Sequence, residues 1–250
     1  MMLELPDQAA LTGMAAFAAG VLNAIAGGGS FLTFPALVFA GVPPVAANAT
    51  SAMAVSPGYL GSALGFGPEL RSLPSPLLRR EVTVAALGGL IGAGLLLVTP
   101  AKLFAGLVPW LLLLATALFA LGPRLARLAG GQGQPRWRLP GLLGVSVYGG
   151  YFNGGLGILL MALYTLTGES RMNTANALKN LNSFVLSLLS VGAFAAAGAI
   201  VWSQALWMML GATLGGWSGA RLARRLPVQW VRTLVIVTGL VMSAVFFNRL

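Results

Sequence analysis

The sequence has no cysteine and no histidine among its 250 residues. The absence of cysteine excludes disulfides and thiol nucleophiles, and the absence of histidine removes the commonest metal ligand. Charged residues are scarce at 8%, whereas a soluble globular protein carries about 25%. Because 57% of the residues are hydrophobic, polar side chains cannot cover the surface, and we expect lipid to cover it.

Acidic residues are scarcer still, with five in the whole chain. All of them are expected at the ends of hydrophobic segments or in loops: Glu4, Asp7, Glu69, Glu81 and Glu169. A sodium site or a carboxylate proton relay inside the membrane therefore lacks its usual residues. No Gly-Lys-Ser or Gly-Lys-Thr sequence follows the glycine clusters, which excludes a Walker-type phosphate loop.

Basic residues outnumber the acids, and the formal net charge is +10. The arginines lie mostly in short loops between hydrophobic segments, which is the positive-inside pattern of membrane proteins. We therefore interpret the net charge as membrane topology and not as a nucleic-acid-binding surface.

The hydrophobic segments predict an all-α polytopic membrane protein. Eight segments are expected at residues 9–41, 46–66, 77–98, 102–121, 139–168, 173–200, 203–220 and 228–247. A glycine-rich stretch with Arg124, Arg127, Arg136 and Arg138 separates the fourth segment from the fifth. We expect a first transmembrane repeat at 1–121, a basic cytoplasmic linker at 122–138 and a second transmembrane repeat at 139–250.

Three sequence blocks recur in the same order in both halves. Gly20, Asn23 and Gly27 correspond to Gly150, Asn153 and Gly157. Ala47-Asn48-Ala49 corresponds to Ala175-Asn176-Ala177, and Gly88-Gly89-x-x-Gly92-Ala93 corresponds to Gly215-Gly216-x-x-Gly219-Ala220. Three blocks at nearly constant spacing indicate an internal repeat.

Segments 9–41 and 139–168 are too long for one simple helix, and glycine clusters interrupt both. Each is either a broken helix that crosses the membrane or a re-entrant hairpin that returns to its own side. If all eight segments cross, the basic linker and the basic loop at 221–225 lie on opposite sides, against the positive-inside rule. If the two interrupted segments are re-entrant, the basic loops share one side, and each half keeps three crossings and is inverted relative to the other. We expect such inverted repeats, and eight plain crossings remain the alternative.

The repeated blocks resemble the signatures of the sulfite exporter TauE/SafE family. The first signature is similar to residues 20–35, Gly-Val-Leu-Asn-Ala-Ile-Ala-Gly-Gly-Gly-Ser-Phe-Leu-Thr-Phe-Pro, and to residues 41–50. The second is similar to residues 148–157 and 175–180, and residues 215–221 also fit. The resemblance implies a membrane permease, not an enzyme, that moves sulfite, sulfonates or other sulfur-containing anions, commonly outward. Asn153 departs from the pattern, which usually has a small residue there.

Lys179 is the most informative single residue, because a cation inside a hydrophobic segment is unfavourable unless it faces a polar cavity. Asn176 and Ser183 share its helix face, and Asn180 follows it. We predict that Lys179 contacts an anion. Alternatively, its side chain extends to the basic side of the membrane or binds carbonyl groups freed by the broken segment. The equivalent position in the first repeat is Ser51, so the site should be asymmetric.

The glycine clusters and the asparagines each have two interpretations. A helix break exposes amide groups and a positive dipole end that would face an anion, whereas small residues also permit close helix packing. Asparagines either contact the solute or tie helices together. We predict a substrate-binding site that comprises Asn23, Gly27, Gly28, Gly29, Ser30, Asn48, Thr50, Ser51, Asn153, Gly154, Gly155, Asn176, Lys179 and Asn180. No catalytic residue, metal or cofactor is expected.

The predicted function is a secondary transporter that exports a small anion, sulfite or an organosulfonate, through a midplane site between two repeats. The membrane potential would drive export, and a proton-coupled permease working in uptake is the alternative. An intramembrane enzyme could use Lys179 and Ser183 as a Ser–Lys dyad, but no third orienting group is evident. The expected partners are the anion and the lipid bilayer, with no nucleic acid, and homo-oligomerisation is left open. The expected location is a bacterial inner membrane with the basic loops in the cytoplasm.

Overall fold

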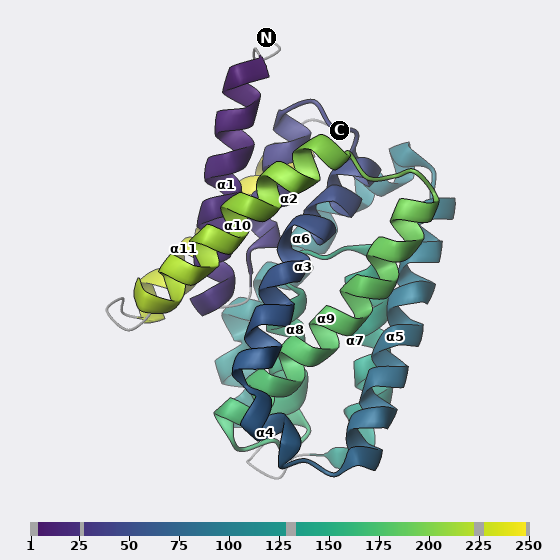
Figure 1. Cartoon of the computed structure of the whole chain (residues 1–250), viewed down its shortest axis with the longest axis vertical. Helices are drawn as coiled ribbons and strands as arrows, with labels where there is room; N and C mark the ends of the chain where they lie inside the picture. The colour runs from purple at the N-terminus through teal and green to yellow at the C-terminus, as the bar shows by residue number, and fades with distance from the viewer. Residues whose placement is uncertain (1–4, 26–27, 129–133, 223–227, 249–250) are drawn as a thin grey trace.

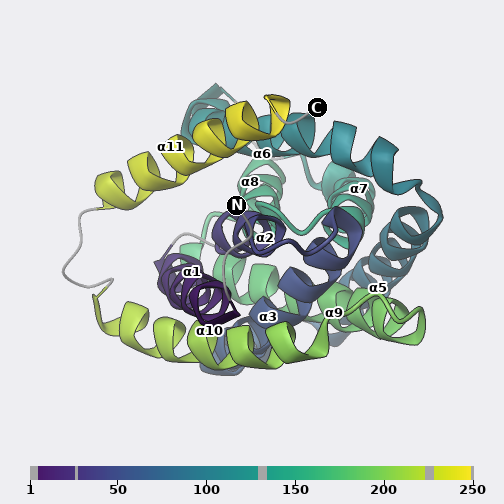
Figure 2. The same ribbon diagram turned by 90° about the horizontal axis from the view of Figure 1, so that it is seen from above.

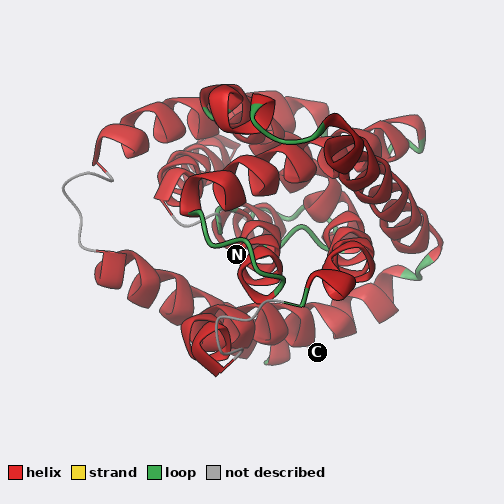
Figure 3. Cartoon of the chain, turned by 90° about the horizontal axis from the view of Figure 1, so that it is seen from below, coloured by secondary structure: helices red, strands yellow, loops and turns green. Residues whose placement is uncertain are grey.

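The computed structural model describes residues 5–25, 28–128, 134–222 and 228–248, which form helices and connecting loops without a strand (Figures 1 and 3). The helices are α1 (Leu5–Ile25), α2 (Ser30–Phe39), α3 (Pro44–Gly65), α4 (Gly67–Arg71), α5 (Ser75–Val98), α6 (Ala101–Leu128), η1 (Pro135–Trp137), α7 (Arg138–Tyr151), α8 (Leu156–Leu166), α9 (Met172–Ala196), α10 (Trp202–Leu222) and α11 (Val228–Phe247). The predicted all-α class is confirmed.

Three of the described helices are long and apolar enough to cross a membrane, namely α5, α9 and residues 101–118 of α6. Large hydrophobic side chains are exposed on α5, α6 and α10, for example Ile91, Trp110 and Leu210. A soluble protein rarely exposes so much apolar surface, and lipid is its natural cover. The chain is therefore an integral membrane protein.

Proline positions explain several helix boundaries. α3 begins at Pro44, α5 follows Pro74 and α6 follows Pro100, because proline fits the first turn of a helix but lacks the amide hydrogen needed further in. Several boundaries differ from the sequence prediction by a few residues; α1, for example, begins at Leu5 and not at residue 9, and α9 ends at Ala196 and not at residue 200. α6 continues beyond residue 121 to Leu128, and the short helix α4 forms within an expected loop. Both runs are too short and too polar for the hydrophobic pattern to report them, and Pro68 suits the first turn of α4.

The structure divides both long hydrophobic segments at their glycine clusters. Segment 9–41 becomes α1 and α2, and segment 139–168 becomes α7 and α8. In the second break, Phe152 has an extended backbone and Gly155 has a φ of 76°, a left-handed conformation that suits glycine. The second pieces, α2 and α8, lie in the interior, while α5, α6, α10 and α11 lie around them (Figure 2). The predicted interruption of each segment is present.

Two pairs of helices pack backbone against backbone. α1 runs along α10, and α5 runs along α7 (Figure 2). A Cβ on Gly20 of α1 would lie 2.1 Å from the carbonyl oxygen of Ala212, and a Cβ on Gly92 of α5 would lie 2.1 Å from that of Val147. Only glycine permits so close an approach, so the packing interpretation applies to these repeated glycines.

The contacts of the two halves correspond to each other. By the sequence repeat, α1, α3, α5 and α6 match α7, α9, α10 and α11. α1 packs on α10 as α7 packs on α5, α3 contacts α9, and α6 contacts α11. Each half thus packs its own first helix against a helix of the other half.

The interrupted segments meet in the hydrophobic core. Phe34 of α2 packs edge-on against Phe152 in the second break, with ring centroids 5.4 Å apart. Phe31, in the first turn of α2, lies beside the same break, because a Cβ added to Gly155 would lie 3.3 Å from its ring. All three aromatic side chains are buried. The fold therefore brings the start of α2 and the break before α8 into one buried region.

Candidate functional site

Asn48 of α3 holds the second break together. Its Nδ2 donates a hydrogen bond to the carbonyl oxygen of Tyr151 over 3.1 Å, and its Oδ1 accepts one from the amide of Asn153 over 3.3 Å. Tyr148 donates from its hydroxyl group to the carbonyl oxygen of Gly154 over 2.8 Å. These side chains satisfy backbone groups that the end of α7 leaves without helical partners. Asn48 therefore ties the two halves together across the break.

Asn153 is buried, with 2% of its surface exposed, yet neither its Oδ1 nor its Nδ2 has a hydrogen-bond partner among the described residues. The amides of Gly154 and Gly155 directly precede α8 and have no hydrogen-bond acceptor in the described part of the chain either. Buried polar groups are almost always paired, so an unpaired buried amide requires an explanation. The break before α8 thus presents donors and the positive end of a helix dipole to its surroundings.

The first break uses its polar groups differently. Oδ1 of Asn23 accepts a hydrogen bond from the amide of Gly29 over 2.7 Å. Gly28, Gly29 and Ser30 are buried, and Ser30 begins α2. Gly27 lies outside the described residues. The asparagine of this break therefore caps its own chain.

Thr50 and Ser51 of α3 also have partners within the protein. The hydroxyl oxygen of Thr50 accepts a hydrogen bond from the amide of Val201 over 3.0 Å and so caps the start of α10. The hydroxyl oxygens of Ser51 and Thr33 lie 2.6 Å apart and share a hydrogen bond. Their predicted contact with the solute stays a prediction.

Lys179 lies in α9 with 7% of its surface exposed. Within the described residues it forms no ion pair and no hydrogen bond. Asn180 is buried next to it, and Asn176, one turn earlier, is half-buried. Ser183, one turn later on the same face, is fully buried with an unpaired hydroxyl group. α9 therefore buries a cation and an unpaired hydroxyl group, and no acid of the described residues pairs with the cation.

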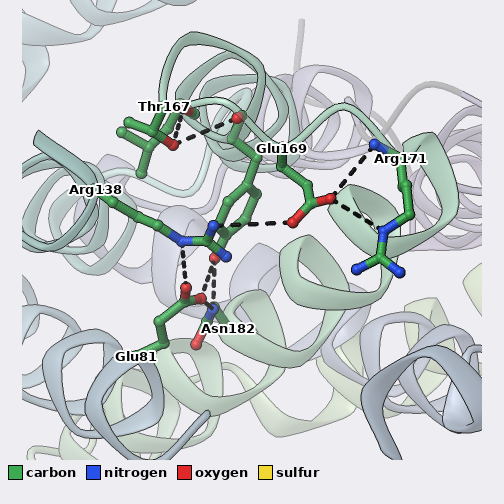
Figure 4. Close-up of polar contacts among 8 residues, drawn as sticks. Glu81, Arg138, Thr167, Glu169, Arg171 and Asn182 are labelled. Carbon is green, nitrogen blue, oxygen red and sulfur yellow. Dashed lines mark hydrogen bonds and ion pairs between the residues drawn. The ribbon is translucent and has the colours of Figure 1, made fainter. Parts of the chain in front are cut away.

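A second buried polar group, which we call the Glu81 cluster, comprises Glu81, Arg138, Tyr164 and Asn182 (Figure 4). Oε1 of Glu81 lies 2.6 Å from Nε of Arg138. Oε2 of Glu81 accepts hydrogen bonds from the Tyr164 hydroxyl group over 2.8 Å and from Nδ2 of Asn182 over 2.9 Å. Glu81, Tyr164 and Asn182 are fully buried. The cluster joins α5 of the first half to α7, α8 and α9 of the second.

Sequence reasoning missed this cluster. Glu81 is separated from its three partners by 57, 83 and 101 positions, and Tyr164 and Asn182 are 18 positions apart, so no local spacing reveals the cluster. The available signal was an acid and an arginine that each lie near the start of a hydrophobic segment. That pattern usually means a solvated helix end, and nothing in it points to Tyr164 or Asn182.

Comparisons with known proteins agree with this architecture. The family model described as sulfite exporter TauE/SafE matches residues 12–246. The chain is 30% identical to a probable membrane transporter protein of Haemophilus influenzae, over 91% of this chain and 90% of that protein. It is also 30% identical to the probable membrane transporter protein YfcA of Escherichia coli K12, over 92% of this chain and 86% of that protein. A probable membrane transporter protein of Sinorhizobium is 27% identical over 92% of this chain and 88% of its own length.

No solved structure gives a significant match to the chain. The family match covers both breaks, the helix with the buried lysine and the Glu81 cluster, so it is not confined to one segment. The family consists of membrane permeases and not of enzymes, which agrees with the sequence prediction. The helices are apolar enough to suit a bilayer, the family match covers nearly the whole chain, and the relatives are named as transporters. We conclude that this chain is a membrane transporter and belongs to the sulfite exporter TauE/SafE family.

Proposed function

We propose that this chain exports a small anion, sulfite or an organosulfonate, across the bacterial inner membrane. The observation that carries the proposal is Lys179, a buried cation with no acidic partner among the described residues. An unpaired charge inside a membrane protein is costly, and such residues usually line the path of a solute or an ion. A negatively charged solute would compensate the charge while it is bound.

The second break supplies further donors for such a solute. Sulfite and the sulfonate group each present three oxygens, which can accept several charge-assisted hydrogen bonds. Nδ2 of Asn153 and the amides before α8 are free to donate, and the Ser183 hydroxyl group lies on the same helix face as Lys179. We place the solute between α8 and α9, which contact each other in the second half.

The solute site lies between two inverted repeats in this proposal, with both interrupted segments re-entrant. The corresponding contacts of the halves support a two-fold arrangement. Figure 1 shows α4 and the start of α5 at one end of the molecule, and the elements there carry exposed arginines: Arg71 in α4, Arg79 and Arg80 in α5, Arg136 in η1 and Arg171 before α9. The positive-inside rule makes this end cytoplasmic.

Accessibility labelling tests the inverted arrangement, and the chain has no cysteine of its own to interfere. Single cysteines replace Gly130 and Arg224, which both lie outside the described residues. Inverted repeats place both positions on the cytoplasmic side, so an impermeant thiol reagent should modify both from that side alone. Modification from opposite sides would show that the interrupted segments cross the membrane.

The membrane potential can drive this export without a coupling ion. The outward movement of an anion from an inside-negative cell is electrically favourable by about 2.3 kcal/mol per charge per 100 mV. Of the described acids, Glu81 is the fully buried one, and Arg138 forms an ion pair with it. In vesicles, flux of a sulfonate should follow an imposed potassium diffusion potential. Uphill sulfonate flux driven by a pH gradient at zero potential would favour the proton-coupled alternative.

The decisive test of the solute class is flux measured across a panel of sulfite, thiosulfate, sulfonates and carboxylates. The reconstituted chain should transport at least one of the sulfur oxyanions with saturable kinetics. Lys179→Met should abolish most of that flux, whereas Lys102→Met, which removes the chain's other lysine at the exposed start of α6, should not. Normal flux through well-inserted Lys179→Met protein would refute the proposed site.

A further inference from the structure

The Glu81 cluster lies where both halves meet at the arginine-rich end of the molecule. Glu81 comes from α5, and its three partners come from the first turn of α7, from α8 and from α9. The Arg138 guanidinium also lies 5.2 Å from the centre of the Tyr164 ring. A relative movement of α5 and α7 would have to break the ion pair between Glu81 and Arg138.

The cluster is poorly suited to a purely structural role. Nη2 of Arg138 and Oδ1 of Asn182 are buried and lack partners among the described residues. A buried ion pair contributes little net stability because both charges lose their hydration, and unsatisfied atoms make the balance worse. The closed arrangement is therefore only modestly favoured over one in which water reaches these groups.

Arg138 has a second carboxylate within reach. Its Nη1 lies 3.9 Å from Oε2 of Glu169, whereas its Nε lies 2.6 Å from Oε1 of Glu81. Glu169 follows α8, and Arg171 also pairs with it at 3.6 Å (Figure 4). A small displacement of α7 away from α5 would transfer the guanidinium from Glu81 to Glu169 without leaving it unpaired.

At the matching junction in the other half, no ion pair joins α1 and α10 among the described residues. There, α1 and α10 are joined by a hydrogen bond from the Thr12 hydroxyl group to Oε1 of Gln204 over 3.0 Å. Nε1 of Trp207 also donates to the carbonyl oxygen of Ala9 over 2.9 Å. Both junctions use the same glycine contacts, so the ion pair is an addition to one of them and not a requirement of the packing.

We propose that Glu81 and Arg138 form the gate that closes the transport path at the arginine-rich end. In this structure the gate is closed. When it opens, Arg138 moves to Glu169, α5 separates from α7, and water enters beside Tyr164 and Asn182. Asn182 and Ser183 lie one turn from Lys179 on α9, so this opening exposes the part of α9 that carries the lysine. The gate depends on the chain being a transporter and not on which solute it carries.

The test measures the accessibility of a cysteine that replaces Ser183, which is fully buried. Membrane vesicles expose the arginine-rich side to an impermeant thiol reagent. With Glu81 and Arg138 intact, Ser183→Cys should react slowly. Adding Glu81→Gln should speed the reaction by about tenfold or more, because loss of the carboxylate charge shifts the population towards the open state.

A second, milder variant guards against misfolding of Glu81→Gln. Tyr164→Phe removes one hydrogen bond to Glu81 and keeps the ring, so the reaction should accelerate by a smaller factor. Thr12→Val at the matching junction and Glu69→Gln outside the cluster serve as controls and should leave the rate unchanged. Unchanged labelling in both Glu81→Gln and Tyr164→Phe would overturn the gate. Faster labelling from both sides of the membrane would also overturn it, because that result means general loosening.

Discussion

The two helix breaks carry asparagines at equivalent positions but use them in different ways. Asn23 accepts a hydrogen bond from its own chain at Gly29, whereas the side chain of Asn153 has no partner among the described residues. In the second break, Asn48 from the other half satisfies the backbone instead. Because another residue has taken over the structural task, Asn153 remains free to contact a solute.

The same difference appears one helix further along the chain. Ser51 of α3 and Lys179 of α9 occupy equivalent positions in the repeat. Ser51 shares a hydrogen bond with Thr33, while Lys179 is buried without a partner in the described part of the chain. At these two pairs of equivalent positions, the side chain of the first half has a partner within the protein, whereas that of the second half has none among the described residues. A fold built from two related halves can therefore have a solute site whose available polar groups come mainly from one half.

The largest expected effect comes from removing the unmatched charge. Lys179→Ala should lower the affinity for the transported anion about ten- to a hundredfold, since a hydrogen bond to a charged group contributes roughly 1.5–3 kcal/mol. Ser51→Ala at the equivalent position should lower it less than about threefold. Binding to the purified protein measures both. Equal losses in the two variants would mean that the halves contribute alike.

The next effect concerns the backbone of the second break. Gly155→Ala should lower the stability by about 1–2 kcal/mol, because alanine is strained at positive φ. The added Cβ would also lie 2.9 Å from that of Ala115. Gly144→Ala in α7 is a matched control, since a Cβ there meets nothing within 4 Å. Thermal unfolding in detergent should show a lower unfolding temperature for Gly155→Ala than for Gly144→Ala. Identical unfolding curves would show that alanine is not strained at position 155.

The smallest expected effects come from alanine substitutions of the two asparagines, one of which should change anion affinity and the other stability. Asn153→Ala should lower anion affinity up to about tenfold with little loss of stability, because it removes one donor that has no partner among the described residues. Asn23→Ala should lower stability by roughly 1 kcal/mol and leave affinity nearly unchanged, because it removes a cap. If Asn153→Ala instead destabilises the protein without affecting binding, the asparagine is structural.

Local features of the sequence predicted most of the fold. Hydrophobic length and glycine clusters located the helices and both interruptions, because each depends on residues that are close together in the chain. The close packing of Gly20 and Gly92 was one of the interpretations that the repeats suggested. The division into two domains around a basic linker remains a prediction.

The site was less predictable because identical residue types have different partners. The sequence does not show which of Asn23 and Asn153 lacks a hydrogen-bond partner, since that depends on Asn48, which is distant from Asn153 in the chain. Glu81 looked like an ordinary helix-end acid, although in the folded chain it is fully buried and hydrogen-bonded to Tyr164 and Asn182. Such roles follow from the tertiary arrangement and not from spacing.

The packing of α1 against α10 has a consequence for biosynthesis. Thr12 and Gln204 are hydrogen-bonded across 192 positions of the chain, so α1 enters the membrane long before its partner is made. During that interval, the glycine face of α1 has only lipid or insertion factors to cover it. Contacts between distant segments form slowly and leave such surfaces exposed to misassembly. A chain truncated before α10 should therefore be a target for membrane proteases, even though it contains the whole first half.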